Sequence, residues 1–149
     1  MNLRQKITED VKAAMRAGEV KRRDALRLLQ AALKQKEVDE RIDLNDADVI
    51  SIIEKMLKQR RDSIAQYEAA QRQDLAEIEK FEVSVLQTYM PEMLSDADLD
   101  HVINEVIASF SKEAPPKIGQ VIAVLKPKLA GQADMSKVAQ LVKEKIAAN

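Results

Sequence analysis

The scarcity of helix-breaking residues is the feature that most constrains how this chain can fold. Only three of its 149 residues are glycine and four are proline. Alanine, leucine, lysine, glutamate, glutamine and arginine are abundant, and these residues have the highest helix propensities. A chain with so few breakers and few β-branched clusters is expected to form long helices joined by short turns. The predicted fold class is therefore all-α.

Apolar residues recur at helical spacing through the first ninety residues and predict four helices. The expected helices cover residues 3–17, residues 20–42, more than twenty residues after Asn45, and residues 74–89. Gly18 is expected to end the first helix in the left-handed conformation, and Asn45 to cap the third. The residue before a proline disfavours helix, so Tyr89-Met90-Pro91 predicts a boundary. An N-terminal subdomain of long helices is therefore predicted over residues 1–90.

The remaining residues, 91–149, show three shorter amphipathic stretches and predict a C-terminal three-helix bundle. Ser95 is a suitable N-cap for the first helix, and Asp134 for the last. Pro116 can occupy the first position of the middle helix, where a missing N–H has no cost. Pro127 is expected to end or kink that helix.

Composition also excludes several classes of protein. The chain has no cysteine, which excludes disulfides, thiolate metal sites and a cysteine nucleophile. Its first ten residues, MNLRQKITED, lack the apolar region of a secretory signal. No apolar run approaches the ~20 residues that span a bilayer. We therefore expect a cytoplasmic protein with no membrane partner.

Residues that make and break bonds are scarce, and we expect no catalytic residues, no metal and no cofactor. His101 is the single histidine, so it cannot form a two-histidine metal motif, and it is interpreted as a surface residue. The glycines are far apart in sequence, which leaves no glycine-rich phosphate loop. Three acidic clusters are interpreted as helix starts or exposed faces; they are Asp46/Asp48, Glu77/Glu79/Glu82 and Asp96/Asp98/Asp100.

Charge is distributed unevenly along a nearly neutral chain. The net charge is −1, yet residues 111–149 carry seven lysines against three acids. Within this segment, Lys126, Lys128 and Lys137 flank Gly131, and the loop leads into the last helix. Backbone N–H groups at a helix start, with lysines nearby, are suited to contact phosphate. A solvated helix face is the alternative interpretation of the same basic stretch.

The order and spacing of several short sequences make the chain similar to a known family over nearly its whole length. In the first half these are Lys58-Gln59-Arg60-Arg61-Asp62-Ser63-Ile64, Arg72-x-Asp74-Leu75, Glu79, Glu82 and Tyr89-Met90-Pro91-x-x-Leu94-Ser95. In the second half they are Ile118-Gly119-Gln120-Val121, Lys126-Pro127-Lys128 and Gly131-x-Ala133-Asp134. With these sequences in this order, the chain resembles the YqeY family.

The resemblance implies a function as well as a fold. The tail of the family resembles the C-terminal helical domain of GatB, the tRNA-handling subunit of the glutamyl/aspartyl-tRNA amidotransferase. That likeness implies an accessory protein whose partner is tRNA or a tRNA-processing enzyme. The residues carried over as tRNA-binding are Lys126, Lys128, Gly131, Gln132 and Lys137. Gln132 stands where family members often have a basic residue.

Two other functions remain open from the sequence. The family is often described as a carbon–nitrogen ligase with glutamine as amido donor, so the chain is alternatively a component of an amido-ligase within a larger assembly. The other alternative is a protein-interaction module with no nucleic-acid role, in which the long second and third helices present an apolar face. Ile64 and Tyr67 are the expected anchors of that face.

Overall fold

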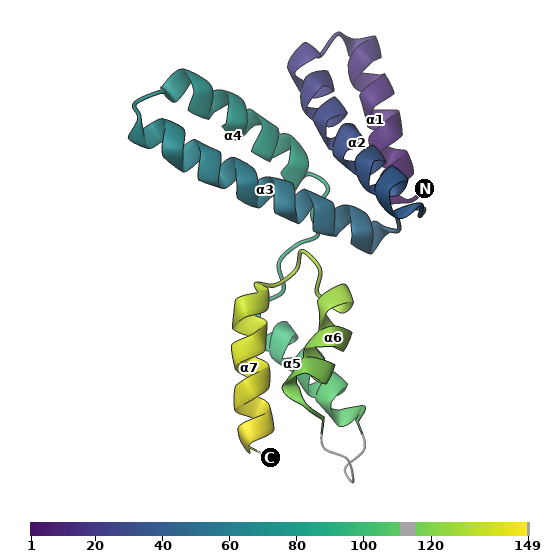
Figure 1. Ribbon diagram of the computed structural model, residues 1–149, viewed down its shortest axis with the longest axis vertical. Helices are drawn as coiled ribbons and strands as arrows, with labels where there is room; N and C mark the ends of the chain where they lie inside the picture. The colour runs from purple at the N-terminus through teal and green to yellow at the C-terminus, as the bar shows by residue number, and fades with distance from the viewer. Residues whose placement is uncertain (111–115, 149) are drawn as a thin grey trace. The chain divides into compact units, whose positions relative to one another are not determined.

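The computed structural model describes residues 1–110 and 116–148 (Figure 1). The regular elements in this described part are all helices, which confirms the all-α fold class. The chain divides into two compact units, Met1–Met90 and Pro91–Asn149. No helix in the described ranges combines the length and the apolar character that a bilayer crossing requires.

The first unit consists of two antiparallel helical hairpins. Its helices are α1 (Leu3–Ala17), α2 (Val20–Glu40), α3 (Asp46–Ala69) and α4 (Gln73–Gln87). Figure 1 shows α1 beside α2 and α3 beside α4. Gly18 adopts φ 70° and lets the chain reverse between α1 and α2, as expected for a C-cap. Asn45 and Asp48 form a reciprocal capping box at the start of α3.

Aliphatic side chains from all four helices fill the core of the first unit. Ile7, Leu26, Leu29, Leu33 and Ile53 are fully buried. The three buried leucines on α2 lie three, four and seven residues apart, which places them along a single stripe of that helix. A hydrogen bond links the segment after α4 to α1. The Tyr89 hydroxyl donates to the Asp10 carboxylate at 2.5 Å.

The second unit is a bundle of three helices. They are α5 (Asp96–Ala108), α6 (Ile118–Lys128) and α7 (Met135–Ala148). Its buried side chains come from all three helices and from the α6–α7 loop. They are Leu99, Ile103, Val106, Val121, Leu125, Leu129, Ala133, Val138 and Val142. Ser95 caps α5 by accepting the Asp98 N–H at 3.1 Å, as expected.

Three helix boundaries differ from the sequence prediction. The fourth helix ends at Gln87 and not at residue 89, with Thr88 as its C-cap. The second helix ends at Glu40 and not at residue 42, because Arg41 turns into the left-handed conformation with φ 53°. The middle tail helix begins at Ile118, after Pro116, because the Gln120 side chain accepts the Lys117 N–H at 3.0 Å and fixes the start there. The preceding Pro115 lies outside the described residues.

Candidate functional site

The loop between α6 and α7 is a tight turn held at the end of the tail bundle where α5 begins (Figure 1). Gly131 adopts φ 73°, a conformation that glycine reaches without strain. The Gln132 N–H donates to the Leu129 carbonyl at 2.9 Å, and the Gln132 carbonyl accepts from the Leu94 N–H at 2.9 Å. The first bond closes the turn, and the second fixes the loop against the segment that precedes α5.

The two lysines at the end of α6 are exposed to solvent. Lys126 and Lys128 lie on either side of Pro127, which is accommodated in the last turn of the helix. Proline lacks the N–H that continues a helix, and α6 ends one residue later. Neither lysine has an ion-pair partner within the part of the chain that the structure describes. Two exposed cations therefore lie in the last turn of α6, shortly before Gly131, and they point to different sides of the helix because they are two residues apart.

Lys137, in contrast, is already paired. Its ammonium group donates to the Asp96 carboxylate of α5 at 2.5 Å. Asp98 lies in the first turn of the same helix. Asp134 accepts the Ser136 N–H at 2.9 Å and so occupies the start of α7, as an N-cap does. The basic stretch of the sequence therefore becomes a surface of mixed charge. Among its described residues Lys137 and Lys145 are paired, whereas Lys126 and Lys128, like Lys117 and Lys143, have no ion-pair partner.

The structure places the five predicted tRNA-binding residues in different environments. Lys126 and Lys128 are exposed, Gly131 is buried in the turn, Gln132 is half-buried and Lys137 is exposed but paired. These five residues include no cysteine, serine, histidine or carboxylate. They can hold an anion such as a phosphate through charge, and their contribution to sequence selectivity is small.

The residues that are able to do acid–base or metal chemistry are dispersed. His101 is exposed and faces Glu105 one turn away, with 2.9 Å between Nε2 and Oε1, which confirms its interpretation as a surface residue. Within residues 1–110 and 116–148, histidine, aspartate and glutamate form no group of three that could hold a metal ion.

A charge cluster in the first unit was missed by the sequence interpretation. Glu79 and Glu82 were assigned to an exposed face, but their side chains are only 19% and 16% exposed. Both pair with Arg60 of α3, which is itself 18% exposed, and the Arg60–Glu79 distance is 3.0 Å. In an antiparallel helix pair, positions equidistant from the turn come together. Arg60 and Glu82 are equally far in sequence from Gln71, which lies in the turn. This symmetry is the sequence feature that could have predicted their contact.

The Arg60 cluster is unbalanced, because two carboxylates share one guanidinium. Burial raises the pKa of the Glu82 carboxyl, Arg60 opposes this shift, and the nearby Glu79 adds to it. The Arg60 Nε is buried without a hydrogen-bond partner among the described residues, and the buried Glu82 Oε2 has the Arg60 Nη1 as its ion-pair partner. The cluster carries a net negative charge in a largely desolvated position.

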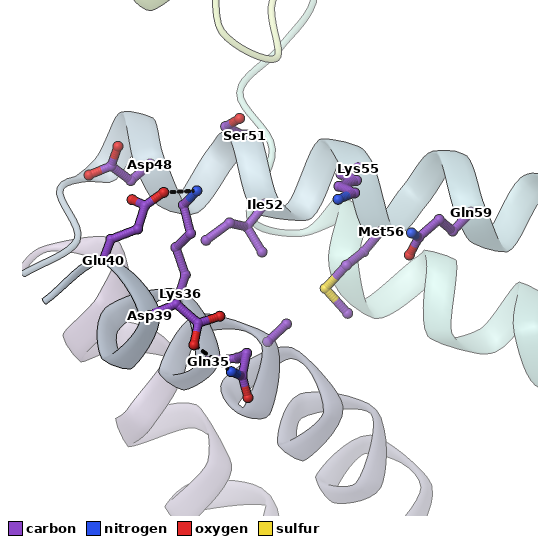
Figure 2. Close-up of a pocket in the computed structure, with 11 residues that line it drawn as sticks. Gln35, Lys36, Asp39, Glu40, Asp48, Ser51, Ile52, Lys55, Met56 and Gln59 are labelled. Carbon is purple, nitrogen blue, oxygen red and sulfur yellow. Dashed lines mark hydrogen bonds and ion pairs between the residues drawn. The ribbon is translucent and has the colours of Figure 1, made fainter. Parts of the chain in front are cut away.

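A pocket of about 530 Å³ lies between the second half of α2 and the first half of α3. Figure 2 shows the side chains that line it. Lys36 pairs with Glu40 at 2.5 Å, and the Gln35 amide donates to Asp39 at 2.8 Å. The apolar side of the pocket includes Ile52. Four of its polar side chains are thus paired with one another along α2, and nothing in the pocket points to a particular ligand.

Together, the fold and the candidate site define a class: all-helical proteins of two units, with a basic turn in the tail and no clustered catalytic groups among the described residues. A family model described as Yqey-like protein matches residues 4–146. The chain belongs to the YqeY-like family, which confirms the resemblance seen in the sequence.

Curated relatives share this similarity at low identity. The protein "Altered inheritance of mitochondria protein 41, mitochondrial" of Kluyveromyces lactis is 30% identical over 115 residues, covering 75% of this chain and 62% of the relative. The protein of that name in Lachancea thermotolerans is 28% identical over 112 residues, covering 73% and 60%. The protein of that name in Saccharomyces cerevisiae strain YJM789 is 28% identical over 121 residues, covering 78% of this chain and 64% of the relative. The chain thus spans about three fifths of the length of these relatives.

The names of these relatives correct one expectation. The absence of a secretory signal and of membrane-spanning segments led us to expect a cytoplasmic protein. The relatives from three yeasts are all named as mitochondrial. The expectation of a cytoplasmic location is therefore wrong, because the composition of a chain reports on its solubility and not on the compartment to which it is delivered.

Proposed function

We propose that this chain is an accessory protein that binds tRNA, or an enzyme carrying tRNA, through the end of α6. The observation that carries the proposal is the exposed pair Lys126 and Lys128, which have no ion-pair partner in the described residues and lie beside the rigid Gly131 turn. Membership of the YqeY-like family supports it, because the family tail is similar to that of a tRNA-handling subunit.

The physical basis of the binding is phosphate neutralisation. An exposed lysine that contacts a phosphate releases a condensed counterion, and binding then weakens as salt is raised. Lys137 contributes less, since Asp96 already neutralises it. Gln132 has its backbone N–H and carbonyl engaged within the bundle, which leaves its side chain as the group able to reach a ligand.

A titration of total tRNA against the full chain at several salt concentrations tests this function. The wild type is expected to bind at low salt, with a log–log slope set by its phosphate contacts. The double variant Lys126→Glu/Lys128→Glu should lower that slope by roughly one to two, since each lost contact removes slightly less than one.

The matched control is Lys55→Glu/Lys58→Glu on α3, which makes the same change in net charge on exposed residues of the other unit. This control should bind tRNA nearly as well as the wild type. Equal losses in the two double variants would show that only the overall charge matters. No binding at low salt, or binding unaffected by the α6 variant, would disprove the function.

A protein-interaction role is the second candidate, and it is favoured by large apolar side chains that the first unit leaves exposed. The expected anchors Ile64 and Tyr67 are half-buried. The more exposed apolar residues of this unit include Ile78 and Phe81 on α4 and Leu28 and Val38 on α2. Their arrangement allows a more specific inference.

A further inference from the structure

A groove of about 490 Å³ lies between α2 and the first half of α4 in the first unit. Ile78 and Phe81 of α4 form its apolar part, together with Ala25 of α2. Ile78 is 57% exposed and Phe81 is 38% exposed. The two side chains are three residues apart and therefore adjacent on one helix face. Adjacent exposed apolar side chains in a concave surface are typical of a binding site for another molecule.

The margins of the groove are acidic. Asp24 on one side, and Asp74 and Glu77 on the other, line it together with a single cation, Lys21. The cations that pair with these three acids, Arg23, Arg72 and Lys80, lie outside the lining. Those pairs are exposed, and exposed ion pairs contribute at most about 1 kcal/mol, so a partner's cations can replace them.

Glu82 adds a negative charge from within the protein. It lines the groove and also belongs to the cluster in which Glu79 and Glu82 share Arg60. Because one guanidinium cannot neutralise two carboxylates, part of this negative charge is left without a counter-charge. It lies in a partly desolvated position, where an added cation is attracted more strongly than at an open surface.

We propose that the α2–α4 groove binds an amphipathic helix of a partner protein, with its apolar side chains on Ile78 and Phe81 and its lysines or arginines facing the acids. Helices bind in grooves through apolar anchors spaced at three, four and seven residues, and charged flanks select the partner. A second copy of the chain docked groove to groove is disfavoured, because twofold symmetry would place these acids against their own equivalents.

Two model peptides test the proposal with the full-length chain. Both are about 18 residues long, or five helical turns, with leucine at helical spacing. One carries lysine at the other positions, and the second carries glutamate there. Amide NMR spectra are recorded during each titration. The lysine peptide should bind, with shifts concentrated in residues 20–28 and 74–82, and the glutamate peptide should bind at least tenfold more weakly.

Matched variants assign the binding to the groove. Ile78→Asp should weaken binding of the lysine peptide about tenfold or more, whereas Val38→Asp should leave it unchanged. Val38 is 60% exposed and lies on α2 outside the lining of the groove, so both variants add one acid at an exposed apolar position. Glu82→Gln removes the unbalanced charge while keeping the side-chain volume, and it should also weaken binding.

Several outcomes would overturn the proposal. These are shifts distributed over both units, equal binding of the two peptides, or equal losses in Ile78→Asp and Val38→Asp. Self-association of the wild type that Ile78→Asp abolishes, measured by sedimentation, would show that a second copy occupies the groove. The tRNA titration is independent, since Ile78→Asp should leave tRNA binding intact and the Lys126/Lys128 variant should leave peptide binding intact.

Discussion

The two units of this protein use charged side chains in opposite ways. In the first unit, charged and polar side chains form largely buried contacts between helices, namely Arg60 with Glu79 and Glu82, Arg4 with Glu37, and Tyr89 with Asp10. In the second unit the core is formed by aliphatic side chains and one alanine. Its interhelical ion pairs, Lys137 with Asp96 and Lys145 with Asp100, include carboxylates that remain more than half exposed.

This difference separates two sources of stability. Aliphatic packing depends on shape and volume, and changes little with pH. A buried charge cluster adds little net stability, yet the loss of one member is costly because the others remain desolvated. The first unit should therefore respond to pH and to single polar substitutions, and the second mainly to cavities. Hydrogen exchange followed by mass spectrometry reads the two units separately within the full chain.

The largest expected effect comes from Leu125→Ala in the second unit. Leu125 is fully buried in the tail core. Removing its side chain leaves a cavity and should destabilise the unit by about 3 kcal/mol. Exchange should accelerate in α5, α6 and α7, by the same factor at pH 5 and pH 7 once intrinsic rates are corrected. Val124→Ala, at a 38% exposed neighbour, should have almost no effect.

Arg60→Met should have the next largest effect, confined to the first unit. The change leaves Glu79 and Glu82 facing one another without a counter-ion, and we expect a loss of about 2 kcal/mol at pH 7. This value lies below that of a fully buried pair, because each side chain keeps almost a fifth of its exposure. The control is Arg61→Met, which makes the same substitution at the exposed neighbouring residue. Equal losses in the two variants would contradict the role of the cluster.

The pH dependence of the Arg60 variant has a defined sign. The pKa of the Glu82 carboxyl is raised in the folded protein, mainly by burial. A group with a raised folded pKa favours folding at low pH, and that contribution disappears as pH rises through the folded pKa. Because Arg60 opposes the rise in the Glu82 pKa, its removal should strengthen the preference for folding at low pH. The deficit of the variant should thus shrink between pH 7 and pH 5, and a deficit constant with pH would rule out the electrostatic explanation.

Tyr89→Phe should have a smaller effect, again in the first unit. The hydroxyl of Tyr89 donates to Asp10, and burial is the main cause that raises the pKa of Tyr89. Loss of this hydrogen bond should cost about 1 kcal/mol, since Asp10 is only partly buried and water can replace the donor. The aromatic ring beside Lys6 is retained. Tyr67→Phe is the control, and an equal loss there would argue against a specific contact.

The sequence predicted the helices well because their signals are local. Apolar periodicity, Gly18 as a C-cap, and Asn45 and Ser95 as N-caps each act within a few residues, and the structure confirms them. The errors at Arg41 and Pro116 have the same origin. A boundary is decided by one residue's conformation or by one side-chain bond, and several neighbouring positions are compatible with the pattern.

The electrostatics of the candidate sites could not be predicted in the same way. Lys137 was read as part of a basic segment, but Asp96, far away in sequence, neutralises it. Glu79 and Glu82 were read as exposed, but Arg60 and the α3–α4 packing bury them. Both cases concern residues brought together by tertiary structure. Composition and local spacing describe charge along the chain, and binding depends on charge in space.

The smallest expected effects concern two glycines and compare backbone demands in the two units. Gly18 has a left-handed φ, whereas Gly119 lies within α6 and a Cβ there would meet no atom within 4 Å. Gly119→Ala should therefore stabilise the second unit by about 0.5 kcal/mol, since alanine has the higher helix propensity and restricts the unfolded chain. Gly18→Ala should destabilise the first unit by about 1 kcal/mol, because a side chain disfavours that φ. Urea midpoints of the two variants test the signs, and a loss of stability in Gly119→Ala would mean that the position has a constraint other than helix formation.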